Sequence, residues 1–151
     1  IVSEDMTNKS TIMCWQGVKQ AVIAAKHGND VIMCPTTHCY FNYYQDKPSS
    51  EPIAMEGLIT LGKAYSFDPM PKGLNESQAK HILGGQCNLW TEFVNTPKQA
   101  EYMLLPRLCA LSECVWSPAD KKNWDNFTNK VAVHQVRLKQ LGYNCSDKRV
   151  K

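Results

Sequence analysis

The fold of this chain is best approached from residues 82–92, which read ILGGQCNLWTE. The stretch begins with apolar residues, continues with two glycines and ends in the segment LWTE. This pattern predicts a buried strand whose last side chains point alternately to its two faces. On this prediction Trp90 and Glu92 share one face. Glycines inside a strand leave no side chain to pack, which is typical of places where another backbone or a ligand comes close.

An indole beside a carboxylate is a pairing that can bind a sugar. The flat ring packs against the C–H face of a pyranose, while the carboxylate accepts hydrogen bonds from the hydroxyl groups. From these residues alone, the commoner outcome is a core tryptophan followed by a surface glutamate. The choice between the two depends on the rest of the chain.

The upstream segment alternates between strand and helix patterns. Residues 11–15 form a short β-rich run, residues 18–27 carry apolar side chains at helical spacing, and residues 31–34 are continuously apolar up to Pro35. Apolar strands separated by a helix indicate a parallel sheet covered by helices, with a right-handed crossover. The fold class predicted for this part is therefore α/β.

The downstream segment is predicted to be mostly helical. Thr96 and Pro97 suit an N-cap and a first helical position, and Pro106 should divide the helix that runs from there to about Val115. Between the two sheet segments we expect a loop at 46–57, a short helix at 58–64, an irregular segment at 66–73 and a helical turn at 75–80. A last helix is expected at 123–141, ended by Gly142. Trp116 is expected to pack at a helix end, and His134 to lie in the core or at its rim.

Several stretches, taken in chain order, resemble one protein family. The glycine-rich stretch is similar to the last barrel strand and helix of family 20 glycoside hydrolases, the β-N-acetylhexosaminidases, through residues 84–92 (GGQCNLWTE), 102–107 (YMLLPR) and 113–117 (ECVWS). Three earlier stretches resemble the two barrel strands that precede it in the family, in the same order: residues 13–17 (MCWQG), 24–35 (AAKHGNDVIMCP) and 39–45 (CYFNYYQ). Together the matches cover most of the chain.

The length of the chain limits what this resemblance implies. A complete (β/α)₈ barrel takes about 250 residues, whereas this chain has 151, of which 43% are hydrophobic. We therefore expect residues 11–142 to be the C-terminal portion, about three βα units, of a (β/α)₈ TIM barrel. Residues 1–10 are expected to be a leader or truncated end, and residues 143–151 a basic tail. A fragment of this kind could also self-associate.

Charge and hydropathy exclude other classes of protein. The net charge of +3 comes from scattered Lys and Arg, and the only dense patch is Lys148, Arg149 and Lys151, so nothing favours nucleic-acid binding. No apolar run approaches the roughly 20 residues of a membrane span, and the first residues lack a signal-peptide pattern. The resemblance implies a periplasmic, secreted or lysosomal compartment, without choosing among them.

Seven cysteines, an odd number, match no dense disulfide framework and are expected mostly as buried free thiols. Cys34, His38 and Cys39 lie close enough in sequence to suggest a metal site. No second ligand pair at zinc spacing follows them, so we expect neither a metal nor a cofactor.

Residues 35–45 carry four aromatic side chains just after a predicted strand, where an α/β barrel places its chemistry. In an extended segment Tyr40 and Asn42 point the same way; the alternative is a packed aromatic loop with a solvated Asn. By resemblance, Tyr40 matches the tyrosine that hydrogen-bonds the substrate's acetamido group. Asn42 stands where the family usually has an aspartate that contacts sugar hydroxyls, and an amide loses the charge-assisted part of that contact.

The resemblance implies removal of terminal β-linked GlcNAc or GalNAc by substrate-assisted retaining hydrolysis. The substrate-binding residues expected here are Trp15, Tyr40, Asn42, Trp90 and Glu92: the tryptophans wall the acetamido pocket and sugar face, Tyr40 orients the acetamido oxygen, and Glu92 holds hydroxyls of the terminal sugar. No catalytic residue is assigned, because the family's pair is Asp followed by Glu on an earlier strand.

The only adjacent acidic pair in this chain, Glu4 and Asp5, has the reverse order and lies in a polar leader. The expected partners are therefore N-acetylhexosamine-terminated glycans and the missing N-terminal part of the same barrel. The alternative is a non-catalytic carbohydrate-binding protein or a structural half-barrel.

Overall fold

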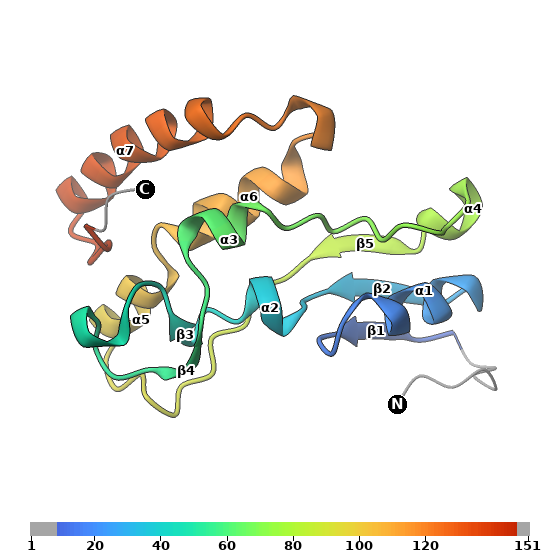
Figure 1. The fold of residues 1–151 in the computed structure, drawn as a ribbon, viewed down its shortest axis with the longest axis horizontal. Coiled ribbons are helices and arrows are strands. Elements are labelled where there is room, and N and C mark those ends of the chain that lie inside the picture. The colour runs from blue at the N-terminus through green and yellow to red at the C-terminus, as the bar shows by residue number, and fades with distance from the viewer. Residues whose placement is uncertain (1–8, 148–151) are drawn as a thin grey trace.

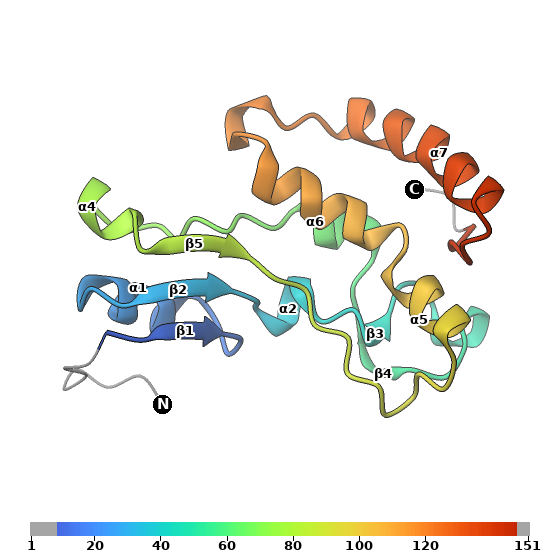
Figure 2. The same ribbon diagram turned by 180° about the vertical axis from the view of Figure 1, so that it is seen from behind.

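The computed structural model describes residues 9–147 (Figures 1 and 2). Its strands are β1 (Thr11–Cys14), β2 (Asp30–Met33), β3 (Tyr43–Tyr44), β4 (Met55–Leu58) and β5 (Ile82–Gly85). Its α-helices are α1 (Val18–Lys26), α2 (Thr36–Cys39), α3 (Leu61–Tyr65), α4 (Glu76–Ala79), α5 (Pro97–Leu104), α6 (Arg107–Trp116) and α7 (Trp124–Gln140), with 3₁₀ turns at Pro48–Ser50 and Ala119–Lys121. Most of the predicted leader, including Glu4 and Asp5, and the basic end of the tail lie outside the described residues.

The strand–helix–strand prediction for the upstream segment is confirmed. Strands β1, β2 and β5 form a parallel sheet in that order, with Ile12 beside Val31 and Cys14 beside Met33. Helix α1 connects the first two strands and ends at Lys26; Gly28, just beyond it, has a φ of 73°, which is easily adopted only by a residue without a Cβ. Strands β3 and β4 make a separate two-stranded parallel ladder.

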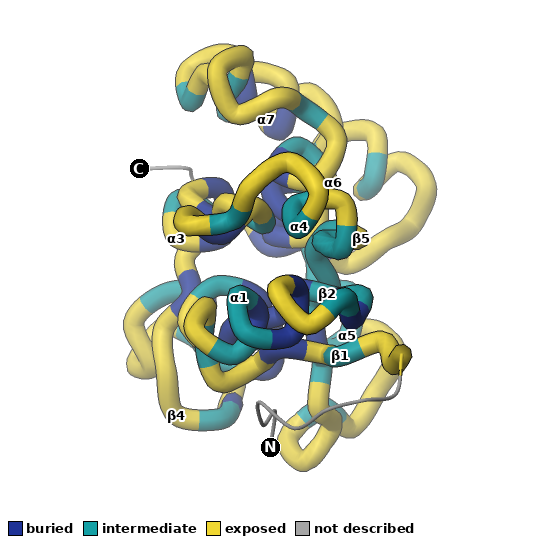
Figure 3. Tube along the Cα trace, turned by 90° about the vertical axis from the view of Figure 1, so that its right-hand side faces the viewer, coloured by how far each residue is buried: buried dark blue, intermediate teal, exposed yellow. Residues whose placement is uncertain are grey.

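The two faces of the three-stranded sheet are covered differently. On one face Cys14, Val31 and Met33 are buried in the core with the alanines of α1. Met13 and Ile32 alternate with them along β1 and β2, and Met13 is exposed. We call this second side, defined by Met13 and Ile32, the open face. Figure 3 shows the buried residues gathered around α1, β2, α3 and α6.

The helical half is held together by aromatic packing and by the predicted caps. The Thr96 side chain accepts a hydrogen bond from the Gln99 N–H, with Pro97 in the first turn, and Pro106 separates α5 from α6 as expected. Helix α7 packs through Phe127, whose ring stacks 4.5 Å from that of Tyr65. These local predictions are therefore confirmed, because each depends on the chemistry of neighbouring residues.

Other predictions about the helical half are wrong. Trp116 is 89% exposed and does not pack at the end of α6, and His134 is exposed on α7. The predicted loop 46–57 contains most of β4, because the Met55 N–H donates to the Asn42 carbonyl and pairs this segment with the β3 region. These partners are distant in sequence, so local patterns give no signal for them.

The predicted long strand at residues 82–92 is also wrong in extent. Strand β5 ends at Gly85 and is only partly buried, with Leu83 exposed. Beyond it, Asn88 makes a single parallel bridge to Tyr40. The strand alternation that placed Trp90 and Glu92 on one face therefore does not hold.

Gly85 has a packing role. A Cβ at this position would lie 2.6 Å from the Phe67 ring and 3.1 Å from a Val115 methyl carbon. A close approach was anticipated for the glycine pair, and at Gly85 it is made by the side chains of Phe67 and Val115.

All seven cysteines are free, and five of them are buried, as expected. Among residues 9–147, no helix is both long and apolar enough to cross a bilayer.

Candidate functional site

The site lies where the chain leaves the carboxyl ends of the parallel strands. There the Thr36 N–H donates to the Trp15 carbonyl at 3.0 Å, and the Gln86 N–H donates to the Met33 carbonyl at 2.9 Å. One step further on, the Asn88 N–H donates to Cys39 O, and the Phe41 N–H donates to Asn88 O, both at 2.8 Å. These bonds bring the segments after all three strands side by side. The carboxyl end of a parallel sheet is also where α/β barrels carry their functional side chains.

Tyr40 is at the centre of this region. Its side chain is 8% exposed, and its ring lies 5.8 Å from that of Tyr43. Burial raises the pKa of the phenol, and the nearby polar side chains of Trp90 and Asn88 oppose part of that rise. The phenol is therefore neutral at physiological pH and retains a proton that it can donate.

Asn42 follows Tyr40 in a turn, with the Tyr43 N–H donating to the Tyr40 carbonyl. The prediction that Tyr40 and Asn42 lie in one extended segment is wrong, and so is the alternative of a solvated Asn. The side chain is 5% exposed, and its Oδ1 has no hydrogen-bond partner within residues 9–147. A buried acceptor without a partner is costly and is uncommon in folded proteins.

Arg107 fixes this turn from behind. Its buried guanidinium donates to the carbonyls of Phe41 at 2.6 Å and Tyr43 at 3.0 Å, on either side of Asn42. It also donates to Ile59 O and Met103 O, and it lies over the Phe41 ring at 4.8 Å. Burial lowers the pKa of Arg107 to about 9, so it stays charged at neutral pH.

The role of Arg107 was missed by sequence reasoning. The signal available was its place in the matched stretch 102–107, which gave no indication of its partners.

The other three predicted site residues are accessible. Trp15 follows β1 and is 44% exposed, and Trp90 is 50% exposed and lies near the Tyr40 phenol. Glu92 is exposed at the start of a turn, and within the described part of the chain no group donates a hydrogen bond to its carboxylate. The structure thus brings Tyr40 and Trp90 together and places Asn42 in the adjoining turn. It gives no contact that joins Trp15 or Glu92 to them.

Asn88 is a second residue that the sequence analysis missed. It is buried, and its Oδ1 accepts a hydrogen bond from Gln86 Nε2 at 2.8 Å. Its Nδ2 has no hydrogen-bond partner in residues 9–147. The sequence showed only that Asn88 lies in the glycine-rich stretch, and nothing in it indicated that the side chain is buried.

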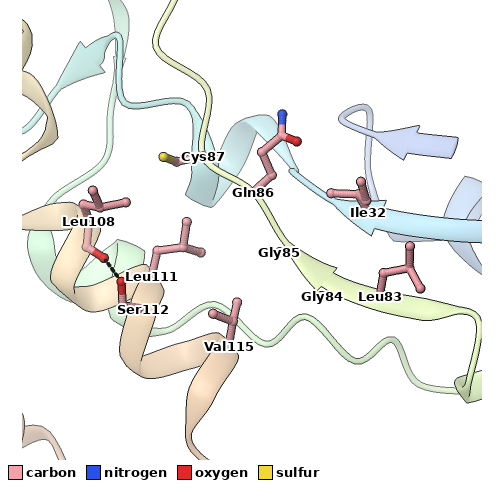
Figure 4. A pocket seen from close by; sticks show the side chains of 10 residues that line it. All are labelled: Ile32, Leu83, Gly84, Gly85, Gln86, Cys87, Leu108, Leu111, Ser112 and Val115. Carbon is pink, nitrogen blue, oxygen red and sulfur yellow. Dashed lines mark hydrogen bonds between the residues drawn. The ribbon is translucent and has the colours of Figure 1, made fainter. Parts of the chain in front are cut away.

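A pocket of about 520 Å³ lies between β5 and α6. Figure 4 shows Leu108, Leu111 and Val115 projecting from α6 toward β5, where Gly84 and Gly85 leave the backbone bare. Its lining is mainly apolar, and it contains none of the five predicted substrate-binding residues. The pocket suits a packing partner better than a sugar.

Metal chemistry has no structural support in the described region. Within residues 9–147, no three His, Cys, Asp or Glu side chains gather where they could hold a metal ion. Burial raises the pKa of Cys34 and of Cys39, so both remain thiols at neutral pH.

Comparison with known proteins identifies the family. Residues 2–119 match the model of the glycosyl hydrolase family 20 catalytic domain. This chain belongs to glycosyl hydrolase family 20. It is 34% identical over 145 residues to a beta-hexosaminidase of Porphyromonas gingivalis, covering 95% of this chain, and 32% identical over 138 residues to a beta-hexosaminidase of Akkermansia muciniphila, covering 89% of it.

Solved structures of family 20 enzymes share the fold. A Vibrio harveyi exo-β-N-acetylglucosaminidase, an inactive mutant, superposes with a TM-score of 0.85 at 30% identity, over 99% of this chain and 23% of that one. A second structure, described as a β-N-acetylhexosaminidase, gives 0.84 at 28% identity, over 99% of this chain and 32% of that one. The chain spans only 19% of the Porphyromonas protein and 28% of the Akkermansia protein.

Proposed function

We propose that this chain is part of a β-N-acetylhexosaminidase that removes terminal β-linked GlcNAc or GalNAc from glycans. The observation that carries the proposal is the buried Tyr40 phenol beside Trp90 at the carboxyl ends of adjacent parallel strands, next to the unpaired Oδ1 of Asn42. A neutral donor, an accessible indole and an unused amide acceptor suit an N-acetylated sugar better than a charged ligand. The relatives' names support the same activity.

The architecture we propose is the C-terminal portion, about three βα units, of a (β/α)₈ barrel formed by residues 11–142. The open face supports this, because parallel sheets are normally buried on both faces. The exposed Leu83 and the apolar pocket along β5 support it as well, since both lie where a further strand and helix would pack.

The proposed mechanism is substrate-assisted retaining hydrolysis, one of the exceptions to the two-carboxylate scheme of glycosidases. Tyr40 donates a hydrogen bond through its O–H to the acetamido carbonyl oxygen and aligns that oxygen with the anomeric carbon. Trp15 and Trp90 wall the acetamido pocket and the sugar face. Asn42 and Glu92 bind sugar hydroxyls. The carboxylate pair that polarises the acetamido group and transfers the glycosidic proton comes from the remaining part of the barrel.

The experiment uses the full-length protein, meaning this chain joined to the rest of the proposed barrel. We expect it to hydrolyse an aryl β-N-acetylglucosaminide and to leave the matched aryl β-glucoside intact, because the glucoside lacks the acetamido nucleophile. Comparable turnover of both substrates would contradict the proposed mechanism. Sugar binding without any turnover would instead favour a non-catalytic carbohydrate-binding protein.

A further inference from the structure

The side-chain amide of Asn88 is held at one end and free at the other. Gln86 Nε2 donates to its Oδ1 at 2.8 Å, which fixes the orientation of the amide and turns Nδ2 the other way. That Nδ2 is buried without a hydrogen-bond partner in the described residues. A buried donor without a partner at hydrogen-bonding distance calls for an explanation, and a contact with the neighbouring Tyr40 phenol that tightens on substrate binding is one.

The backbone places this free donor beside Tyr40. Asn88 and Tyr40 form a parallel bridge, held by the two 2.8 Å bonds from Asn88 N–H to Cys39 O and from Phe41 N–H to Asn88 O. Side chains of paired residues in neighbouring extended segments lie on the same face. The Asn88 amide and the Tyr40 phenol are therefore lateral neighbours, with Trp90 also close to the phenol.

We propose that Asn88 is a positioning residue that donates a hydrogen bond from Nδ2 to Tyr40 Oη when substrate binds. A phenol carries one proton and accepts through its oxygen. If the amide donates a hydrogen bond to that oxygen, the phenolic O–H is directed toward the substrate. If the Oδ1 end faced the phenol, it would accept the same proton and withdraw it from the acetamido carbonyl. Gln86 decides between the two orientations because it binds Oδ1.

This inference rests on the proposed hexosaminidase function. A double-mutant cycle in the full-length protein tests the role of Asn88 separately from the activity itself. The variants are Asn88→Ala, Tyr40→Phe and their combination, compared by kcat and KM on an aryl β-N-acetylglucosaminide. We expect Asn88→Ala to lower kcat about 10-fold with Tyr40 present, and less than about 2-fold with Tyr40→Phe, because residues that act through each other are not additive. KM should change less than kcat.

A structural role for Asn88 would lower kcat by the same factor in both backgrounds, and that result would overturn the inference alone. Absence of turnover by the unmutated protein would overturn the proposed function and this inference together. The two failures are therefore distinguishable.

Gln86→Glu gives a second test that hardly changes side-chain volume and does not depend on Asn88→Ala folding. A carboxylate only accepts hydrogen bonds, so the Asn88 amide should turn its Nδ2 toward the new carboxylate and present Oδ1 to the phenol. We expect kcat to fall about as far as in Asn88→Ala, again only when Tyr40 is present. The matched control, Gln140→Glu on the exposed end of α7, should retain full activity. Unchanged kcat in Gln86→Glu would contradict the role of the amide orientation.

Discussion

The two faces of the three-stranded sheet differ in how completely this chain covers them. The face that carries Cys14, Val31 and Met33 is buried in the core with the alanines of α1. The open face leaves Met13 exposed, and Leu83 is also exposed on the edge strand. One buried face and one solvated face of polar residues are typical of antiparallel sheets, whereas parallel sheets are normally buried on both faces. The covered face is packed by this chain's own residues, whereas the open face leaves apolar side chains uncovered, which supports the proposed barrel fragment.

The largest effect expected from this comparison is on activity. The 151-residue chain alone should not hydrolyse an aryl β-N-acetylglucosaminide, because the proposed acid–base pair belongs to the part that would complete the open face. General acid–base groups contribute roughly 10²–10⁴ in rate. Steady-state assays of the isolated chain and the full-length protein at equal concentration check this. Turnover by the isolated chain that a family inhibitor abolishes would refute it.

The free energy of unfolding should be most sensitive to substitution of the buried Arg107. Arg107→Lys keeps a charge but loses the planar fork that binds the carbonyls of Phe41, Tyr43 and Ile59. Leaving buried carbonyls without donors should lower the free energy of unfolding by about 3–5 kcal/mol. Urea unfolding of the full-length protein measures the loss.

The matched control for Arg107 is Arg137→Lys on the exposed side of α7, which should change stability by less than about 0.5 kcal/mol. Equal midpoints for the two variants would show that the carbonyl contacts of Arg107 contribute little.

At the rim of the site the expected effect is smaller and concerns binding. In the full-length protein, Glu92→Gln should weaken substrate binding and slow turnover by about 1.5–3 kcal/mol, because a charged hydrogen-bond acceptor becomes a neutral amide. The pH optimum should stay in place, since Glu92 is not the proton donor. Glu76→Gln, at another exposed glutamate, is the control. A shifted limb of the pH profile with unchanged affinity would make Glu92 a proton-transfer residue.

The smallest effect concerns packing beside β5. Gly85→Ala places a methyl group 2.6 Å from the Phe67 ring and should cost about 1–3 kcal/mol. Gly62→Ala in α3 meets only a 3.5 Å contact with Trp124 and should be neutral or slightly stabilising. Thermal unfolding of both full-length variants compares them. A harmless Gly85→Ala would mean that the Phe67 ring can move away.

The sequence predicted those parts of the fold that depend on neighbouring residues. Thr96 with Pro97 identified the start of α5, and Pro106 its separation from α6, because capping and the missing proline N–H act within one turn. The strand–helix–strand order followed from apolar periodicity alone. Tyr40 and Trp90 were both assigned to the substrate-binding wall through the resemblance, and the structure places the Trp90 side chain near the Tyr40 phenol.

The features that the sequence did not reveal depend on contacts between residues distant in the chain. The β2–β5 ladder ends with the bond from the Gln86 N–H to Met33 O, and the chain next pairs with the segment after β2 through the bond from the Asn88 N–H to Cys39 O. Arg107 and Asn88 could not be assigned roles, since their partners are carbonyls and side chains brought close only by the fold. The assignments of all five residues to substrate contacts remain predictions: Trp15, Tyr40, Asn42, Trp90 and Glu92.

The central claim is that the open face is completed by the rest of a barrel, and light scattering of the isolated 151-residue chain at micromolar concentration tests it most directly. Unpaired strand edges and an apolar face larger than a few hundred Å² are uncommon in monomers. We expect the chain to self-associate, and to become monodisperse when the remaining part of the barrel is supplied. A monodisperse monomer with a cooperative thermal transition would contradict the claim, because it would mean that this chain closes its own core.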